Sequence, residues 1–143
     1  MRRVYCVAAC RTAVTPRHGA LAGLGVDALA APVIERVLQD AGLAATAVDA
    51  VVMGNALYGG GNPARLAALR AGLAEQTPAM TVDTQCCSGL DAIALATASI
   101  AASMDEVIVA GGLESWSRSP IRQHRPLSAD AAPQTYTRPP FSP

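Results

Sequence analysis

The sequence contains no lysine: all 11 of its basic residues are arginine, and 11 acidic residues balance them. Without lysine, the 143 residues cannot form a lysine-dependent phosphate-binding loop or a Schiff base with a carbonyl substrate. The formal net charge of zero also lacks the basic excess that nucleic-acid phosphates require. We therefore expect no nucleic-acid partner.

Long apolar runs and paired cysteine motifs are also absent. The six apolar residues between Arg3 and Cys10 are too few for a secretory signal, whose core needs ~7–15. No uncharged run approaches the ~18 residues of a membrane helix. We expect no membrane segment and a cytoplasmic location. The cysteines, at positions 6, 10, 86 and 87, favour reduced thiols and no metal site, because they form no CxxC pair.

What is present is a strongly apolar chain of about one domain's length. Apolar residues make up 51% and charged residues 15%, a balance too apolar for intrinsic disorder. Short apolar runs alternate with segments of helical periodicity, which begin at N-cap candidates such as Asp27 and end near glycines such as Gly42. The pattern predicts strands at 4–9, 48–53, 80–84 and 107–110, and helices at 27–41, 63–73 and 88–103.

This βαβαβαβ order indicates an α/β fold with a mostly parallel sheet covered on both faces. The helix at 88–103 has Asp91 as its only charge and is predicted to be buried. Residues 118–143 differ: they have no apolar periodicity, and six of the ten prolines lie in 120–143. Taken alone, this segment would be a disordered tail or linker.

Residues 82–90, Val-Asp-Thr-Gln-Cys-Cys-Ser-Gly-Leu, place cysteine where a buried strand turns into a helix. Backbone N–H groups and the positive end of the helix dipole stabilise a thiolate there. Ser88 and Gly89 keep the approach narrow and let the backbone come close to an acyl group. On spacing alone the alternative stays open that Cys86 and Cys87 are small buried hydrophobic residues at a tight turn.

Gln85-Cys86-Cys87-Ser88-Gly89-Leu90 resembles the nucleophile motif of thiolases, a Cys followed by a small residue and Ser-Gly-Leu. Three more blocks match in the same order: Ala-Cys-Arg-Thr at 9–12, Asn-Pro-Ala-Arg at 62–65 and Ala-Gly-Gly-Leu-Glu-Ser-Trp-Ser at 110–117.

The resemblance implies a thiolase fold and acyl-CoA or 3-oxoacyl-CoA substrates. It implies Cys86 as the acyl-accepting nucleophile, with Ser88 and Gly89 binding substrate, and coenzyme A as a substrate, with no cofactor. It also implies that 1–117 form an N-terminal half-domain, and that 118–143 open a loop domain covering the active site.

Departures from the thiolase pattern leave other functions open. Asp83, Thr84 and Trp116 stand where the family usually has Asn, Arg and Met. The Asp83-Thr84 pair is also similar to the ketosynthase motif, so a fragment of a ketosynthase-like condensing enzyme is the alternative.

Thiolases are longer, with a second half that carries a Gly-His-Pro histidine, an Asn-bearing motif and a Cys-x-Gly cysteine. Gly-His-Pro does not occur here, and Cys-x-Gly occurs only as Cys87-Ser88-Gly89 inside the nucleophile motif, so the sequence shows no counterpart of that second half. His18 and His124 are predicted to lie in loops, and Cys6 and Cys10 to be packing residues. We expect a fragment or one part of a split enzyme, or else a non-catalytic half that pairs with a complete subunit. The partner is a second copy or a complementary C-terminal half.

Overall fold

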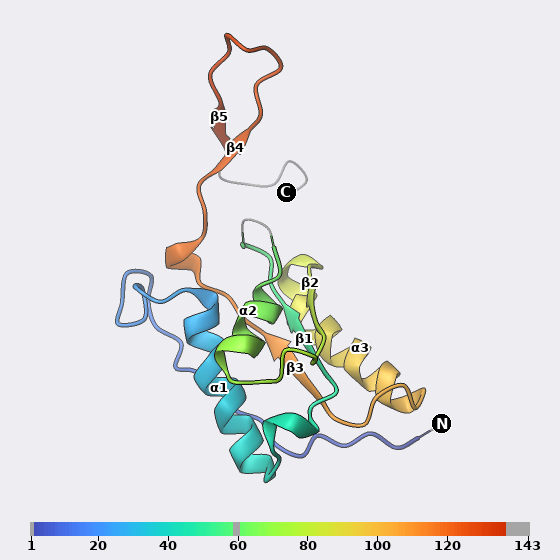
Figure 1. Cartoon of the computed structure of the whole chain (residues 1–143). Helices are drawn as coiled ribbons and strands as arrows, with labels where there is room; N and C mark the ends of the chain where they lie inside the picture. The colour runs from blue at the N-terminus through green and yellow to red at the C-terminus, as the bar shows by residue number, and fades with distance from the viewer. Residues whose placement is uncertain (1, 59–60, 137–143) are drawn as a thin grey trace.

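The computed structural model describes residues 2–58 and 61–136 as a three-layer α/β body with a projecting arm (Figure 1). In chain order its helices and strands are α1 (Val26–Ala41), β1 (Ala50–Gly54), α2 (Pro63–Arg70), β2 (Ala79–Val82), α3 (Ser88–Ala101), β3 (Ile108–Gly112), β4 (Arg122–His124) and β5 (Gln134–Tyr136). Short 3-10 turns lie at η1 (Ala45–Ala47), η2 (Gln85–Cys87) and η3 (Trp116–Arg118).

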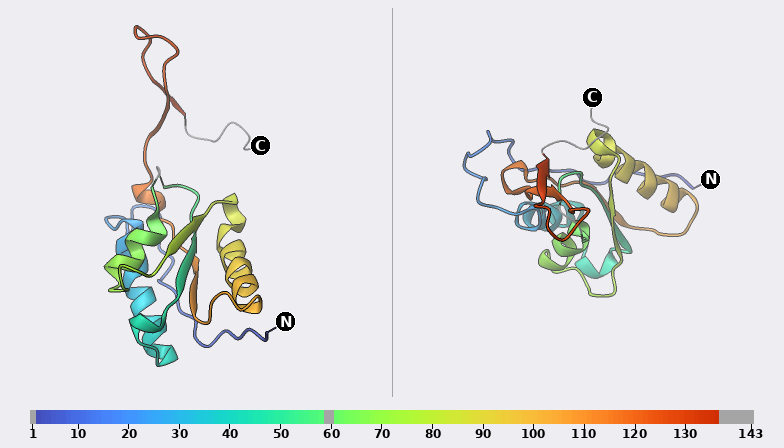
Figure 2. Two further views of the ribbon diagram at one scale, coloured as in Figure 1. Left: turned by 45° about the vertical axis from the view of Figure 1, so that its right-hand side comes forward. Right: turned by 90° about the horizontal axis from the view of Figure 1, so that it is seen from above.

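The central sheet is parallel, with strand order β2-β1-β3. Val51 in the middle strand aligns with Ala79 on one side and Val109 on the other. Helices α1 and α2 cover one face of the sheet and α3 covers the other (Figure 2). The predicted parallel α/β architecture is therefore confirmed.

The core lies between the sheet and the layer formed by α1 and α2. Val51 and Ile34 are almost fully buried, and the three alanines at 64, 67 and 68 of α2 are fully buried. Alanine lets α2 approach β1 and α1 closely, and an ion pair from Arg70 Nη1 to Asp27 Oδ2 at 3.0 Å links the two helices at the surface.

The predicted strand at residues 4–9 is wrong. This segment is extended but pairs with no described strand, and Tyr5 and Val7 are about 70% exposed. An apolar run becomes a strand only where a neighbouring strand supplies partners for its N–H and C=O groups, and none is present here.

Helix boundaries also differ from the predictions at three ends: α1 begins at residue 26 and not 27, α2 ends at 70 and not 73, and α3 ends at 101 and not 103. Gly25, not Asp27, is the N-cap of α1: Asp27 is the second residue of the helix, and its carboxylate accepts a hydrogen bond from Arg70. Gly42 ends α1 in the left-handed conformation, as predicted. Helix α3 is not buried on all sides, since Leu90 is 70% and Ile93 50% exposed. Only one of its faces meets the sheet.

Residues 118–136 are more regular than predicted. They leave the body through η3 and form an arm in which β4 pairs antiparallel with β5 (Figure 1). His124 thus lies in a strand and not in a loop. The assignment of 118–143 to a separate loop domain stays a prediction, and residues 137–143 lie outside the described part.

Helix α3 begins against the carboxyl end of β1 with no side chain between them. A Cβ placed on Gly54 would lie 2.3 Å from the carbonyl carbon of Ser88 and 2.5 Å from the nitrogen of Gly89. A Cβ on Gly112, at the end of β3, would lie 3.5 Å from the Cα of Gly89. Glycine at 54 is therefore a steric requirement for the position of α3.

Replacing Gly54 with alanine should push the first turn of α3 off the sheet and cost about 1–3 kcal/mol of unfolding free energy, the usual range for overpacking. Gly111→Ala is the matched control, because a Cβ there meets only Met53 Sδ at 3.9 Å. Chemical denaturation measures both. Equal midpoints for the two variants would contradict the steric requirement.

Asp49 joins the start of β1 to the loop that leads into β3. Its Oδ2 accepts hydrogen bonds from the backbone N–H groups of Val107 at 2.9 Å and Glu106 at 2.8 Å, and these bonds lower the pKa of Asp49. A carboxyl whose pKa is lowered by folding stabilises the protein above its unfolded pKa, and that stability disappears as the pH falls through the folded value.

The variant Asp49→Asn should therefore unfold at lower temperature at pH 7 and lose less stability than wild type between about pH 5 and pH 2. Thermal melts across that range give the comparison, with Asp130→Asn on the exposed arm as a matched charge control. If the melting temperatures of wild type and Asp49→Asn fall equally as the pH is lowered, the two hydrogen bonds to Asp49 contribute no pH-dependent stability.

Candidate active site

The turn from β2 into α3 carries Cys86 and Cys87. Both lie in η2, immediately before the first residue of α3, and both side chains are exposed. This overturns the alternative that they are small buried residues at a tight turn. Gln85, just before Cys86, has φ +60°, a left-handed conformation that few residues other than glycine adopt. The chain therefore reverses sharply at the cysteine.

Hydrogen bonds within the turn hold this reversal. The Ser88 hydroxyl donates to the Gln85 carbonyl at 2.6 Å and accepts from the Thr84 N–H at 2.9 Å. The Asp83 carboxylate accepts from the Gln85 N–H at 3.0 Å. Ser88 is buried and its hydroxyl is used inside the turn, so it positions the Cys86 backbone. A contact of Ser88 or Gly89 with substrate stays a prediction.

The position of Cys86 suits a nucleophile. Its thiol is exposed at the N-terminal end of the 14-residue α3, where the positive end of the helix dipole favours a negative charge. The turn lies at the carboxyl edge of a parallel sheet, the edge at which α/β proteins bind ligands. Thiolate formation and attack on an acyl carbon are the chemistry that this arrangement allows.

A second polar cluster lies at the same edge and was not predicted as part of the site. The Glu114 carboxylate accepts hydrogen bonds from Asn55 Nδ2 at 3.1 Å and from the N–H groups of Ala56 at 3.1 Å and Leu57 at 3.2 Å. Asn55 is buried, and its amide also donates to the Leu113 carbonyl at 2.8 Å. The cluster ties the loop after β1 to the end of β3. Its sequence signal is a polar residue close after each strand: Asn55 directly follows β1, and Glu114 is the second residue after β3.

A small cavity of about 220 Å³ opens beside this cluster. It is lined by Asn55, Ala56, Tyr58, Gly61, Pro63, Thr81 and Asp83. Asp83 precedes Cys86 by three residues, so the cavity adjoins the cysteine turn.

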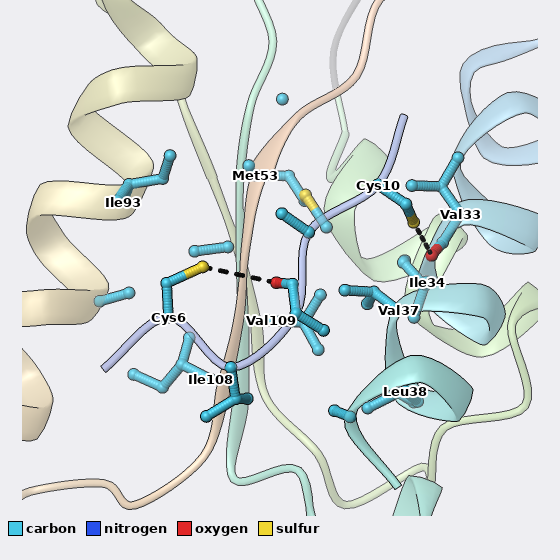
Figure 3. A pocket seen from close by; sticks show the side chains of 18 of the residues that line it. Cys6, Cys10, Val33, Ile34, Val37, Leu38, Met53, Ile93, Ile108 and Val109 are labelled. Carbon is cyan, nitrogen blue, oxygen red and sulfur yellow. Dashed lines mark hydrogen bonds between the residues drawn. The ribbon is translucent and has the colours of Figure 1, made fainter. Parts of the chain in front are cut away.

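The other candidate residues lie on different elements. Cys6 and Cys10 are on the unpaired N-terminal segment, where their thiols donate to the carbonyls of Ala8 at 3.5 Å and Val33 at 3.3 Å (Figure 3). Both are exposed, so they are not the core packing residues that were predicted. His18 lies in a loop, as predicted, and its backbone N–H donates to Ser117 Oγ at 3.3 Å. Cys86, Ser88 and Gly89 are thus brought together in one turn, away from both histidines.

The described residues contain neither a metal-binding cluster nor a membrane-spanning helix. No group of three or more His, Cys, Asp or Glu side chains in 2–58 and 61–136 is placed to hold a metal ion. None of the helices described there has the length and apolar character needed to cross a membrane.

Known proteins resemble this chain over nearly all of its length. The family model for the thiolase N-terminal domain matches residues 4–138. An acetyl-CoA acetyltransferase of Pseudomonas aeruginosa is 48% identical over 122 residues, 84% of this chain and 31% of the relative. A probable acetyl-CoA acyltransferase of Staphylococcus aureus is 41% identical over 123 residues, 85% of this chain and 31% of the relative.

A putative acetyl-CoA C-acetyltransferase of Staphylococcus aureus, VraB, is 39% identical over 145 residues, 100% of this chain and 38% of the relative. The chain therefore spans about a third of the length of the curated relatives it matches. The match of residues 4–138, together with the parallel sheet and the cysteine turn at its carboxyl edge, places the chain in the thiolase family as an N-terminal domain.

Proposed function

We propose that residues 1–143 form the nucleophile-bearing part of a thiolase-type acyltransferase that acts on acyl-CoA and 3-oxoacyl-CoA thioesters through an acyl-Cys86 intermediate. The observation that carries this proposal is the exposed Cys86 thiol at the N-terminal turn of α3. The names of the relatives, acetyl-CoA acetyltransferase and acetyl-CoA acyltransferase, supply the substrate class. Coenzyme A takes part as a substrate, and the proposal includes no cofactor. A cytoplasmic location stays a prediction.

In the degradative direction, the Cys86 thiolate attacks the ketone carbon of a 3-oxoacyl-CoA. The bond between the ketone carbon and its neighbour breaks, and the carbanion of acetyl-CoA leaves and takes a proton from an acid. The thiol of free coenzyme A then gives its proton to the conjugate base of that acid and displaces the acyl group from Cys86, which regenerates the thiolate. The same steps in reverse join two acyl thioesters. The positive end of the α3 dipole stabilises charge on the thiolate.

The reaction also needs a base to form the thiolate and a second acid to protonate the carbanion. No described histidine lies on the turn that carries Cys86. His18 and His124 lie on a loop and on the arm, and Cys6 and Cys10 on the N-terminal segment. We propose that polypeptide beyond these 143 residues supplies both groups, either as a complementary thiolase C-terminal half or as a subunit in an oligomer.

The alternative is a ketosynthase-like condensing enzyme. In such an enzyme a carbanion attacks acyl-Cys86 in the condensing direction, and thiolysis of a 3-oxoacyl thioester is not catalysed. Asp83 and Thr84 favour this reading. The thiolase family match favours the thiolytic reaction. A half that pairs with a complete subunit without catalysing anything is the third possibility, and the experiments below separate the three.

Cys86 should react with limiting iodoacetamide ~2–5-fold faster than the other three thiols, the range expected when a helix N-terminus stabilises the thiolate. All four thiols are exposed, so access alone does not distinguish them. Mass spectrometry after brief labelling of the folded chain maps the products. Cys87→Ser is the matched control and should leave the Cys86 rate unchanged. Fastest labelling at Cys87, or equal labelling of all four, would contradict the assignment.

Residues 1–143 alone should form a stoichiometric acyl adduct at Cys86 with acetyl-CoA but show no repeated thiolysis of acetoacetyl-CoA above the Cys86→Ala background. Acid–base help contributes roughly 10²–10⁴-fold to each step, and we propose that both groups lie on other polypeptide. Intact-mass analysis detects the adduct, and free-thiol consumption measures turnover.

Adding a polypeptide that carries a thiolase histidine and Cys-x-Gly motif should restore thiolysis in the wild type and not in Cys86→Ala. Condensation without thiolysis would favour the ketosynthase reading. Many turnovers by the chain alone would show that its own histidine serves as base, and a bound but inactive complex would favour the non-catalytic half.

A further inference from the structure

The peptide unit between Ala56 and Leu57 is held at both of its ends by charged side chains. Its carbonyl oxygen accepts a hydrogen bond from Arg122 Nη2 at 3.0 Å, and its N–H donates to Glu114 Oε2 at 3.2 Å. The same Glu114 oxygen also accepts the N–H of Ala56 at 3.1 Å. One peptide of the loop after β1 is therefore fixed from two sides, by a residue just after β3 and by the first residue of β4.

The charges of these two side chains match the dipole of the peptide between them. The guanidinium of Arg122 meets the negative carbonyl end, and the carboxylate of Glu114 meets the positive N–H end. Hydrogen bonds with one charged partner are roughly twice as strong as neutral ones. A flipped peptide would direct its oxygen at the carboxylate and its N–H at the guanidinium, so both contacts would become repulsive. The pair therefore selects one orientation of this peptide.

Arg122 reaches the loop from a distant part of the sequence. It lies 66 residues after Ala56 and begins β4, where the hairpin of the arm starts (Figure 1). Arg122 is half-buried, whereas Gln123 and Arg125 on the same arm are exposed. The bond to the Ala56 carbonyl therefore joins the arm to the loop after β1.

The same loop is joined to the strand that leads into the cysteine turn. The Asn55 N–H donates to the carbonyl of Val82, the last residue of β2, at 2.9 Å. The next residue, Asp83, lines the cavity of about 220 Å³ together with Asn55 and Ala56. Val82 precedes Cys86 by four residues. The orientation of the loop therefore bears on the cavity wall and on the chain that carries the cysteine.

We propose that Arg122 is a positioning residue of the candidate active site: it holds loop residues 55–57 beside the cysteine turn and makes the start of the arm part of that site. The proposal rests on the proposed function and deepens it, because it names a residue of the arm on which the geometry around Cys86 depends. Arg122 acts through the Ala56 carbonyl. A displacement of the arm would break this bond and release the peptide.

Amide hydrogen exchange at Leu57 tests the lock on the peptide without any acyl transfer. Arg122→Met keeps the aliphatic stem and removes the guanidinium. The Leu57 N–H should then exchange at least about tenfold faster, the effect expected for one charge-assisted hydrogen bond. Arg122→Lys keeps a charged donor and should stay within about threefold of wild type. Arg125→Met, on the exposed part of the arm, is the matched control and should change nothing. Unchanged exchange in Arg122→Met, or the same rise in Arg125→Met, would overturn the proposal.

Glu114→Gln tests the opposite end of the same peptide. It should also speed exchange at Leu57, and it decides alone if Arg122→Met does not fold. In the double variant, the combined effect should be smaller than the product of the two separate effects, because both side chains hold one peptide. Effects that multiply would mean that Arg122 and Glu114 act independently, which contradicts the lock.

The rate of acyl-Cys86 formation with acetyl-CoA separates positioning from direct substrate binding. Arg122→Met should lower the rate at saturating acetyl-CoA at least about threefold and leave the half-saturating concentration within about twofold, since a displaced loop disturbs the reacting geometry. A higher half-saturating concentration at an unchanged maximal rate would mean that the guanidinium binds coenzyme A directly, and positioning would be wrong. Absence of an adduct in the wild type counts against the proposed function, whereas Leu57 exchange that does not depend on Arg122 counts against this proposal.

Discussion

The close approach of the backbones of β1 and α3 is the constraint on which the rest of the structure depends. Gly54 leaves no room for a side chain between the end of β1 and the Ser88-Gly89 peptide, and this contact sets where α3 begins. The start of α3 in turn sets the position of η2 and of Cys86. The nucleophile is therefore located by main-chain packing, which is stiffer than any contact made by a flexible side chain.

Much of this arrangement could be predicted from the sequence because it depends on local pattern. The apolar runs at β1, β2 and β3 and the periodicity of α1 gave elements within a few residues of those observed. The cysteine turn followed from its place between a strand and a helix. The N-terminal segment could not be predicted in this way, since an apolar run does not reveal whether a partner strand is beside it. The Asn55 and Glu114 cluster also escaped prediction, because it joins residues 59 apart through contacts that only the fold creates.

A catalytic cysteine needs a fixed position and a base that activates its thiol. One short chain segment can supply the first of these but not the second. Ser88 and Asp83 hold the sharp turn and orient the backbone around Cys86 with bonds made within a few residues. A base must instead approach the sulfur from outside the turn, because the side chains inside it are already bonded to the backbone. Positioning of the thiol and activation of the thiol are therefore separate structural tasks, and the described residues perform the first.

Two neighbouring strands end on the same turn of α3. Gly54 closes β1 against the Ser88-Gly89 peptide, and Gly112 closes β3 against Gly89. Because both strands reach this turn without an intervening side chain, a displacement of either strand would also shift the first turn of α3, and Cys86 with it. The position of the nucleophile is therefore tied to two strands of the sheet at once.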